Sequence, residues 1–340
     1  MNYADKKICL LYTGGTIGMT RSENGYVPER DAFLHMLRGI SDLNRPDSPK
    51  FDVIEFDPLL DSCNIAVCEW NQMGQAIADH YAEYDGFVIL HGTDTMSYSA
   101  SALSFMLENL AKPVIFTGAQ IPLCEIRSDA RGNIVNAVLI AAAGIVNEVC
   151  IYFDGRLLRG NRSTKKSSDQ FAAFESPNYP LLAEAGIQIR YLPANIRPRP
   201  EAPFRFQPFA EVPIGVIKLF PGIQFELFEH IMTESLKGVI LESFGAGNIP
   251  SSRTSILPII EKAHRNGSII VVCSQCVQGT VTLGTYATSK ALHDIGAVDG
   301  HDMNTEAALA KLYFLLSKGY PMEVVRQLMT RNLCGELTAN

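Results

Sequence analysis

The chain has little of what marks a membrane, secreted or nucleic-acid-binding protein. None of its apolar runs approaches the ~20 residues that a helix needs to span a bilayer. Its first apolar run, residues 8–11, is too short for the core of a secretory signal and leads directly into glycines. Basic residues are outnumbered 29 to 36, which gives a net charge of −7. These absences predict a soluble protein with neither a membrane nor a nucleic acid as partner.

Metal-binding and redox motifs are also scarce. The eight cysteines are scattered, and only Cys273 and Cys276 form a C-x-x-C pair. No second pair lies at metal-binding spacing, and a closed zinc site needs four ligands. Several of the other cysteines lie inside apolar runs, which is typical of buried, reduced thiols. We therefore expect no metal site and a protein of the reducing cytoplasm.

Glycines follow the first apolar run, but they fit no nucleotide-binding loop. Residues 13–18, TGGTIG, match neither G-x-G-x-x-G nor a loop ending in G-K-[ST]. Residues 20–28 have the composition of a loop, not of the helix that would bind a pyrophosphate. We interpret them as a mobile cover over a site, in which Asn24 and Gly25 allow bending and Tyr26 faces the site. The alternative for Tyr26 is an exposed loop aromatic.

Apolar runs and helix-period segments alternate along the chain. Continuous apolar strands separated by helices are typical of parallel sheets covered on both faces, so we predict an α/β fold. The predicted strands are residues 8–11, 87–90, 114–116, 149–153, 214–217, 239–241 and 269–272. The predicted helices are residues 101–109, 134–143, 256–265, 305–317 and 322–332.

One proline-rich segment breaks this alternation. Residues 191–213 contain six prolines and almost no periodicity, which is typical of an interdomain linker. The sequence therefore predicts a larger N-terminal catalytic α/β domain over residues 1–190 and a smaller C-terminal α/β domain over residues 214–340. Each domain is expected to hold a mostly parallel sheet between helices.

Two threonine-rich segments, residues 13–18 and 91–95, directly follow predicted strands. Ligands bind beyond the carboxyl ends of strands in open α/β sheets, so both segments should meet at one edge. A threonine hydroxyl is a weak nucleophile that needs a base and a charged partner. Asp94, beside Thr93, is one candidate. Lys165 follows another strand and is a second candidate, although taken alone it fits a solvated loop lysine.

Four segments together resemble the bacterial-type L-asparaginases, most closely the cytoplasmic type I branch: residues 13–19, 91–96, 117–120 and 160–165. The resemblance covers essentially the whole chain. It implies hydrolysis of L-asparagine to L-aspartate and ammonia, without a metal or an organic cofactor. It also implies that Thr16 attacks the side-chain carbonyl and forms an acyl-enzyme, assisted by the lid tyrosine Tyr26.

The resemblance implies roles for further residues of the same edge. Thr93, Asp94 and Lys165 match a second triad that handles protons and positions water. The main chain around Thr93 or Ala119 would stabilise the oxyanion.

Substrate contacts and assembly are implied in the same way. Asp61, Ser62 and Asp94 match contacts to the α-amino and α-carboxylate groups, although Asp61 and Ser62 alone also fit a turn or a helix cap. Asn248 matches a residue that reaches in from a partner subunit. The resemblance therefore implies a homo-oligomer, as a dimer of dimers.

Two departures from the family pattern stand out. Cys63 replaces the glutamine of secreted members. Some type I enzymes have an effector site for asparagine, and Ser274 and Cys276 fall on it, but Glu242 stands where its arginine is expected. A carboxylate there would repel the carboxylate of the effector, unless a nearby arginine such as Arg253 or Arg265 restores the site.

Other functions remain open from the residues. A glutaminase or another amidase would use the same scaffold, although the acidic composition and the lack of an RNA-binding segment disfavour charged tRNA as a substrate. A non-catalytic amino-acid sensor would use the same pockets but would not need Thr93, Asp94 and Lys165 together.

Overall fold

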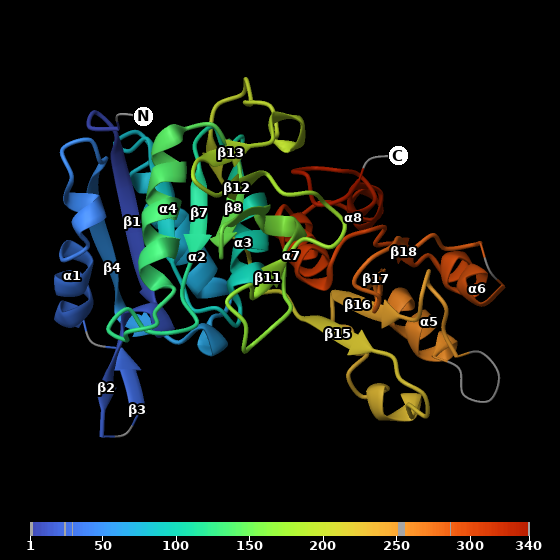
Figure 1. Ribbon diagram of the computed structural model, residues 1–340. Coiled ribbons are helices and arrows are strands. Elements are labelled where there is room, and N and C mark those ends of the chain that lie inside the picture. Colours follow the sequence, from blue (N-terminus) through green and yellow to red (C-terminus); the bar gives the residue numbers. More distant parts are fainter. Residues whose placement is uncertain (1–2, 24, 29, 251–255, 286, 339–340) are drawn as a thin grey trace. The chain divides into compact units, whose positions relative to one another are not determined.

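The computed structural model describes residues 3–23, 25–28, 30–250, 256–285 and 287–338. It divides into two compact units, Met1–Gln207 and Pro208–Asn340 (Figure 1). The boundary between the two units falls inside the proline-rich segment 191–213. Within the described ranges, no helix has the length and apolar character needed to cross a bilayer.

An eight-stranded sheet forms the centre of the first unit, in the order β13-β12-β9-β8-β7-β5-β1-β4. Five neighbouring strands are parallel: β4 (Lys50–Leu60), β1 (Lys7–Gly14), β5 (Gly86–Leu90), β7 (Val114–Thr117) and β8 (Val149–Phe153). Three antiparallel strands extend the far side: β9 (Arg156–Arg159), β12 (Ala183–Ala185) and β13 (Ile189–Tyr191). The predicted α/β fold with a mostly parallel sheet is confirmed.

Helices cover both faces of this sheet. α1 (Arg30–Arg38) and α4 (Ala130–Ala143) share one hydrophobic core with inward residues of β1, such as Ile8 and Leu10. α2 (Val67–Asp79) and α3 (Met96–Met106) pack against each other, where Trp70 Nε1 donates to Ser99 Oγ at 3.0 Å. They lie behind the sheet when α4 is in front (Figure 1). Because both faces are covered, the central strand β5 is buried along its whole length.

Several elements of the first unit differ from the sequence prediction. β4 is missing from it because this edge strand has only exposed and half-buried residues, and its charged residues interrupt any continuous apolar run. Residues 20–28 are predicted as a loop, but the described part of this segment forms an antiparallel hairpin of β2 (Met19–Ser22) and β3 (Gly25–Pro28). The predicted helix 101–109 begins earlier, at Met96, and gives way to β6 (Leu107–Glu108).

Two short ladders complete this unit. β6 pairs with β14 (Arg205–Phe206), so part of the proline-rich segment is structured. β10 (Thr164–Lys165) pairs with β11 (Phe174–Glu175). The second ladder fixes the backbone that carries Lys165.

The second unit holds a smaller, parallel four-stranded sheet in sequential order. Its strands are β15 (Ile214–Lys218), β16 (Gly238–Ser243), β17 (Ile269–Ser274) and β18 (Val298–Asp299). Its helices are α5 (Leu257–Arg265), α6 (Ala287–Ile295), α7 (Thr305–Ser317) and α8 (Met322–Met329). This matches the predicted smaller C-terminal α/β unit.

Candidate active site

Three loops meet beyond the carboxyl ends of β1, β4 and β5, and glycines allow their close approach. A Cβ atom on Gly14 would lie 2.3 Å from Leu60 O, and one on Gly15 would lie 2.4 Å from the main-chain N of Gly92. A Cβ atom on Gly92 would lie 2.5 Å from Ser62 Oγ. Gly14 and Gly15 also have positive φ angles of 123° and 83°. The glycines of the two threonine motifs therefore bring the backbones together.

Hydroxyl groups then fasten these loops to one another. Thr13 Oγ1 donates to Leu90 O at 3.0 Å, and Thr95 Oγ1 donates to Ser62 O at 2.7 Å. Asp61 caps the short 3₁₀ helix Ser62–Asn64 by accepting from Cys63 N at 3.2 Å. Thr13 and Thr95 thus join the loops, whereas the other threonines of the motifs, Thr16 and Thr93, line the cavity described next and are the candidates for chemistry.

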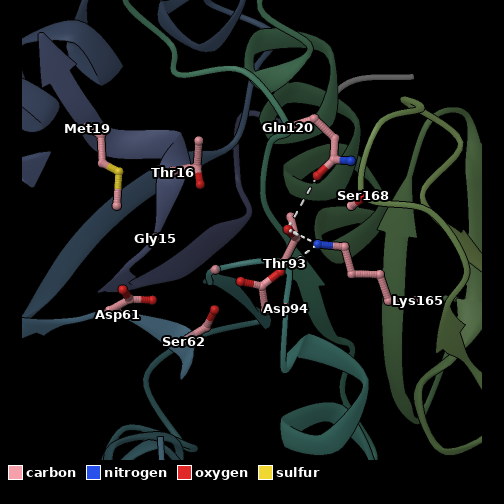
Figure 2. Close-up of a pocket in the computed structure, with 11 residues that line it drawn as sticks. Gly15, Thr16, Met19, Asp61, Ser62, Thr93, Asp94, Gln120, Lys165 and Ser168 are labelled. Carbon is pink, nitrogen blue, oxygen red and sulfur yellow. Dashed lines mark hydrogen bonds and ion pairs between the residues drawn. The ribbon is translucent and has the colours of Figure 1, made fainter. Parts of the chain in front are cut away.

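A cavity of about 220 Å³ opens at this edge of the first unit. That volume is below the ~300–1,000 Å³ of pockets for drug-sized ligands and suits a molecule as small as an amino acid. In Figure 2, Thr16 lies on the same side of the cavity as Met19 and Asp61, whereas Thr93 lies beside Lys165 on the opposite side. The lining residues are Gly15, Thr16, Met19, Asp61, Ser62, Gly92, Thr93, Asp94, Gln120, Lys165 and Ser168.

Lys165 links Thr93 and Asp94. Its Nζ donates to Thr93 Oγ1 at 2.8 Å and lies 2.8 Å from Asp94 Oδ1 (Figure 2). The lysine side chain is only 16% exposed, whereas that of Asp94 is 67% exposed, so solvent screens the carboxylate. Lys165 is therefore not a solvated loop lysine. It is a nearly buried amine directed at a threonine hydroxyl.

The buried side chain of His91 holds the loop that carries Thr93 and Asp94. Its ring is fully buried, and loss of hydration lowers the pKa of His91 to about 4. In the neutral form, Nδ1–H donates to Gly92 O at 2.6 Å. His91 therefore stays uncharged near neutral pH and fixes the main chain beside Thr93.

Two predicted residues of the first unit do not line the cavity. The Tyr26 hydroxyl donates to Glu125 Oε1 at 2.7 Å, and this bond raises the pKa of Tyr26. The tyrosine is 43% exposed at the hairpin β2–β3. Asn24, which we expected to flex beside it, lies outside the described residues. Ala119 is buried, and its neighbour Gln120 reaches the cavity instead.

The remaining predicted residues belong to the second unit. Asn248 closes a tight turn with Phe244, with main-chain bonds of 3.0 and 2.8 Å. Glu242 Oε1 accepts from Thr305 Oγ1 at 2.5 Å, and Glu242 Oε2 lies 3.7 Å from Lys218 Nζ. Its carboxylate is thus already partnered inside the unit.

Ser274 is the last residue of β17, and Cys276 lies two residues beyond it. Ser274 Oγ donates to Gly245 O at 2.7 Å and accepts from Cys276 N at 3.0 Å. The two cysteines of the C-x-x-C pair lie in different environments. Cys276 is exposed, whereas Cys273 is buried, and burial raises the pKa of Cys273 to about 12. Across the described residues, no group of three or more His, Cys, Asp or Glu side chains is arranged to hold a metal ion.

Besides glycines, three residues of the cavity were given no role from the sequence: Met19, Gln120 and Ser168. Gln120 carries a usable signal, since it lies three residues beyond the carboxyl end of β7, where the sheet presents ligand-binding groups. Ser168 lies in the turn between β10 and β11 and carries no such signal.

Fold and cavity together define a two-unit α/β protein with paired threonines at the carboxyl edge of the larger sheet. The asparaginase N-terminal family model matches residues 7–197, and the glutaminase/asparaginase C-terminal domain model matches residues 213–329. The chain therefore belongs to the asparaginase family.

Individual relatives cover nearly the whole chain. It is 46% identical to L-asparaginase 1 of Escherichia coli (strain K12) over 98% of both chains. The crystal structure of L-asparaginase I from Vibrio cholerae O1 biovar eltor has a TM-score of 0.91 and 44% identity, and the match covers 98% of this chain and 99% of that one. The thermostable L-asparaginase from Thermococcus kodakarensis has a TM-score of 0.89 and 32% identity, covering 98% and 100%.

Proposed function

We propose that the chain hydrolyses L-asparagine to L-aspartate and ammonia through a threonine nucleophile. The observation that carries the proposal is one cavity with Thr16 on one side and a Thr93–Lys165–Asp94 cluster on the other. Its volume fits one amino acid, and relatives of the same family are named L-asparaginases.

The cavity offers complementary groups for a zwitterionic amino acid. Asp61 and Asp94 supply negative charge for the α-ammonium group, and Ser62 supplies a hydroxyl for the α-carboxylate. The side-chain amide then extends between the two threonines. Of the main-chain groups proposed for the oxyanion, those of Gly92 and Thr93 belong to the cavity wall, which favours them over Ala119.

The reaction proceeds in two displacements. Thr16 Oγ1 attacks the side-chain carbonyl carbon, its proton passes to the amide nitrogen, the C–N bond breaks, and ammonia leaves an aspartyl ester. Water then attacks the ester carbon, the bond to Thr16 Oγ1 breaks, and one proton of the water returns to Thr16. Thr93, Lys165 and Asp94 orient this water and handle its proton.

Tyr26 reaches this chemistry only if the hairpin moves. Its bond to Glu125 must break before the hydroxyl can assist Thr16. We therefore infer that the hairpin is a lid, and that the structure holds it open.

Membership of the asparaginase family also supports proposals about the assembly, the regulation and the cellular location of this protein. We infer a homo-oligomer, a dimer of dimers, in which Asn248 completes the site of a partner subunit. Glu242 accepts from Thr305 and lies 3.7 Å from Lys218 Nζ, so a carboxylate that is already partnered stands where the effector-binding arginine is expected. No disulfide joins any of the eight cysteines, which fits a reducing cytoplasm.

Ammonia release from asparagine and from glutamine by the purified chain tests the proposal. We expect turnover of asparagine, unchanged by EDTA. Thr16→Ala and Thr93→Ala should each lower kcat by on the order of 10³- to 10⁶-fold, and the double variant should be far from additive. A wild-type chain without asparagine turnover would overturn the proposal. Activity lost on chelation would overturn its metal-free mechanism.

A further inference from the structure

Gln120 makes a hydrogen bond with Thr93 that the proposed mechanism does not use. Thr93 Oγ1 donates to Gln120 Oε1 at 3.3 Å (Figure 2). Building on the proposed function, we propose that Gln120 is a positioning residue. It accepts the Thr93 hydroxyl proton and so leaves the oxygen's lone pairs facing Lys165 and the cavity.

The second bond of the Gln120 amide fixes which of its atoms faces Thr93. Gln120 Nε2 donates to the main-chain carbonyl of Gln170 at 3.1 Å, and a carbonyl can only accept. The amide oxygen must therefore face Thr93. Because an amide oxygen also only accepts, the threonine must be the donor of that bond.

A single direction of hydrogen bonding results. The protonated Lys165 amine has no lone pair, so it donates to Thr93 Oγ1 at 2.8 Å. The Thr93 hydroxyl has one proton, which Gln120 takes, and two lone pairs, of which Lys165 uses one. The other lone pair is free to accept from a water in the cavity. A water that donates one proton to Thr93 keeps its own lone pair for attack on the ester.

Loss of the Gln120 oxygen would free the Thr93 proton. The hydroxyl could then rotate and donate to a cavity water or to Asp94, which Lys165 holds close to Thr93. A water that accepts this proton has its lone pair occupied and is a poorer nucleophile. The expected cost falls on the chemical step and not on substrate binding.

The backbone that carries Gln120 is rigidly held. Gln120 N donates to both carboxylate oxygens of Asp129 at 3.1 and 3.0 Å, and Ile121 N donates to Oδ1 at 3.0 Å. Asn133 Nδ2 donates to Asp129 Oδ2 at 3.2 Å and to Gly118 O at 3.0 Å. Both Asp129 and Asn133 are anchored at the start of α4. Such support is what a residue that orients a reacting group requires.

Gln120→Met tests the proposal, because it keeps the length of the side chain and removes the acceptor. We expect kcat for asparagine to fall roughly 5- to 100-fold, the cost of leaving one hydroxyl without its partner, with KM changed by no more than about twofold. The thermal midpoint should stay near that of the wild type. Gln75→Met, on the exposed surface of α2, is the matched control and should retain full kcat.

Gln120→Glu adds a readout that a purely structural role would not produce. An ionised carboxylate can accept from Thr93 but cannot donate to Gln170 O, which repels it out of position. A protonated carboxyl makes both bonds of the amide, because its O–H donates to Gln170 O and its C=O accepts from Thr93. The charged groups facing this side chain are Lys165 through Thr93, Asp94 beside Lys165, and Asp129 through the main chain. With each rate divided by that of the wild type, Gln120→Glu should recover relative to Gln120→Met as the pH falls from about 8 to about 5.

Four outcomes are decisive. Loss of kcat in Gln120→Met with acid recovery in Gln120→Glu supports the proposal. A Gln120→Met enzyme with wild-type kcat, or equal losses in both variants at every pH with a raised KM, overturns it while the proposed function stands. A wild-type chain that releases no ammonia from asparagine overturns the proposed function, and this inference with it.

Discussion

Acid should destabilise the first unit through His91. The buried ring has a pKa of about 4, below its usual 6.5, because the protonated form loses its hydration. Below pH 6.5, His91 therefore binds a proton in the unfolded chain but stays neutral in the folded chain. The contribution of the neutral His91 ring to the free energy of unfolding is fully present above pH 6.5, and it is lost as the pH drops towards 4. The full loss is about 3 kcal/mol, and about 2 kcal/mol is already lost near pH 5.

Thermal unfolding at about pH 8 and about pH 5 measures this loss. For a unit of about 200 residues, 2 kcal/mol corresponds to a fall of about 4–8 °C in thermal midpoint from this one group. His91→Asn removes the titration, so the difference between the two pH values should shrink by that amount.

Phe116→Leu is the matched control for this experiment. Its ring centroid lies 5.5 Å from that of His91, so the variant disturbs the same core without removing a titrating group. It should lower the midpoint equally at both pH values. If His91→Asn keeps the whole acid sensitivity of the wild type, the reasoning about the buried imidazole is wrong.

Three further predictions concern the lid, the assembly and regulation. Bound aspartate should slow hydrogen exchange in the hairpin of residues 19–28, because closure replaces the Tyr26–Glu125 bond with contacts to the site; equal exchange with and without aspartate would contradict this. Mixed particles of Thr16→Ala and Asn248→Ala subunits should regain activity, because one site of each pair then has both residues; an active monomer or no recovery in mixed particles would refute the shared site. Asparagine saturation should be close to hyperbolic, since Glu242, already partnered with Lys218 and Thr305, offers an effector carboxylate no guanidinium and so removes a coupling of typically ~1–3 kcal/mol. Comparison with Glu242→Arg checks this last point, and clear sigmoidicity in the wild type would show it to be wrong.

The sequence predicts well the parts of this protein that depend on continuous burial. The strands β5, β7, β8 and β17 lie within one or two residues of their predicted positions because both faces of each sheet are covered. The predicted helix 305–317 is α7 itself. An edge strand such as β4 cannot be predicted in this way, because it is only partly buried and so lacks a continuous apolar run.

Some residues of the site can likewise be predicted from the sequence, and others cannot. Thr16, Thr93 and Asp94 follow strands of one parallel sheet, so their meeting at one edge follows from topology. Lys165 is brought in by the β10–β11 ladder, and Ser168 by the turn of that ladder, which only the folded backbone reveals. The orientation of Gln120 depends on a carbonyl fifty residues away, and no local pattern encodes it.

The most direct test of the account is to locate the covalent intermediate. Lys165→Met should slow hydrolysis of the ester, so that enzyme quenched during turnover of asparagine retains an aspartyl group. Peptide mass spectrometry should find that group on Thr16, and Thr16→Ala should carry none. An aspartyl group on Thr93 instead, or near-normal turnover by Thr16→Ala, would contradict the assignment of Thr16 as the nucleophile.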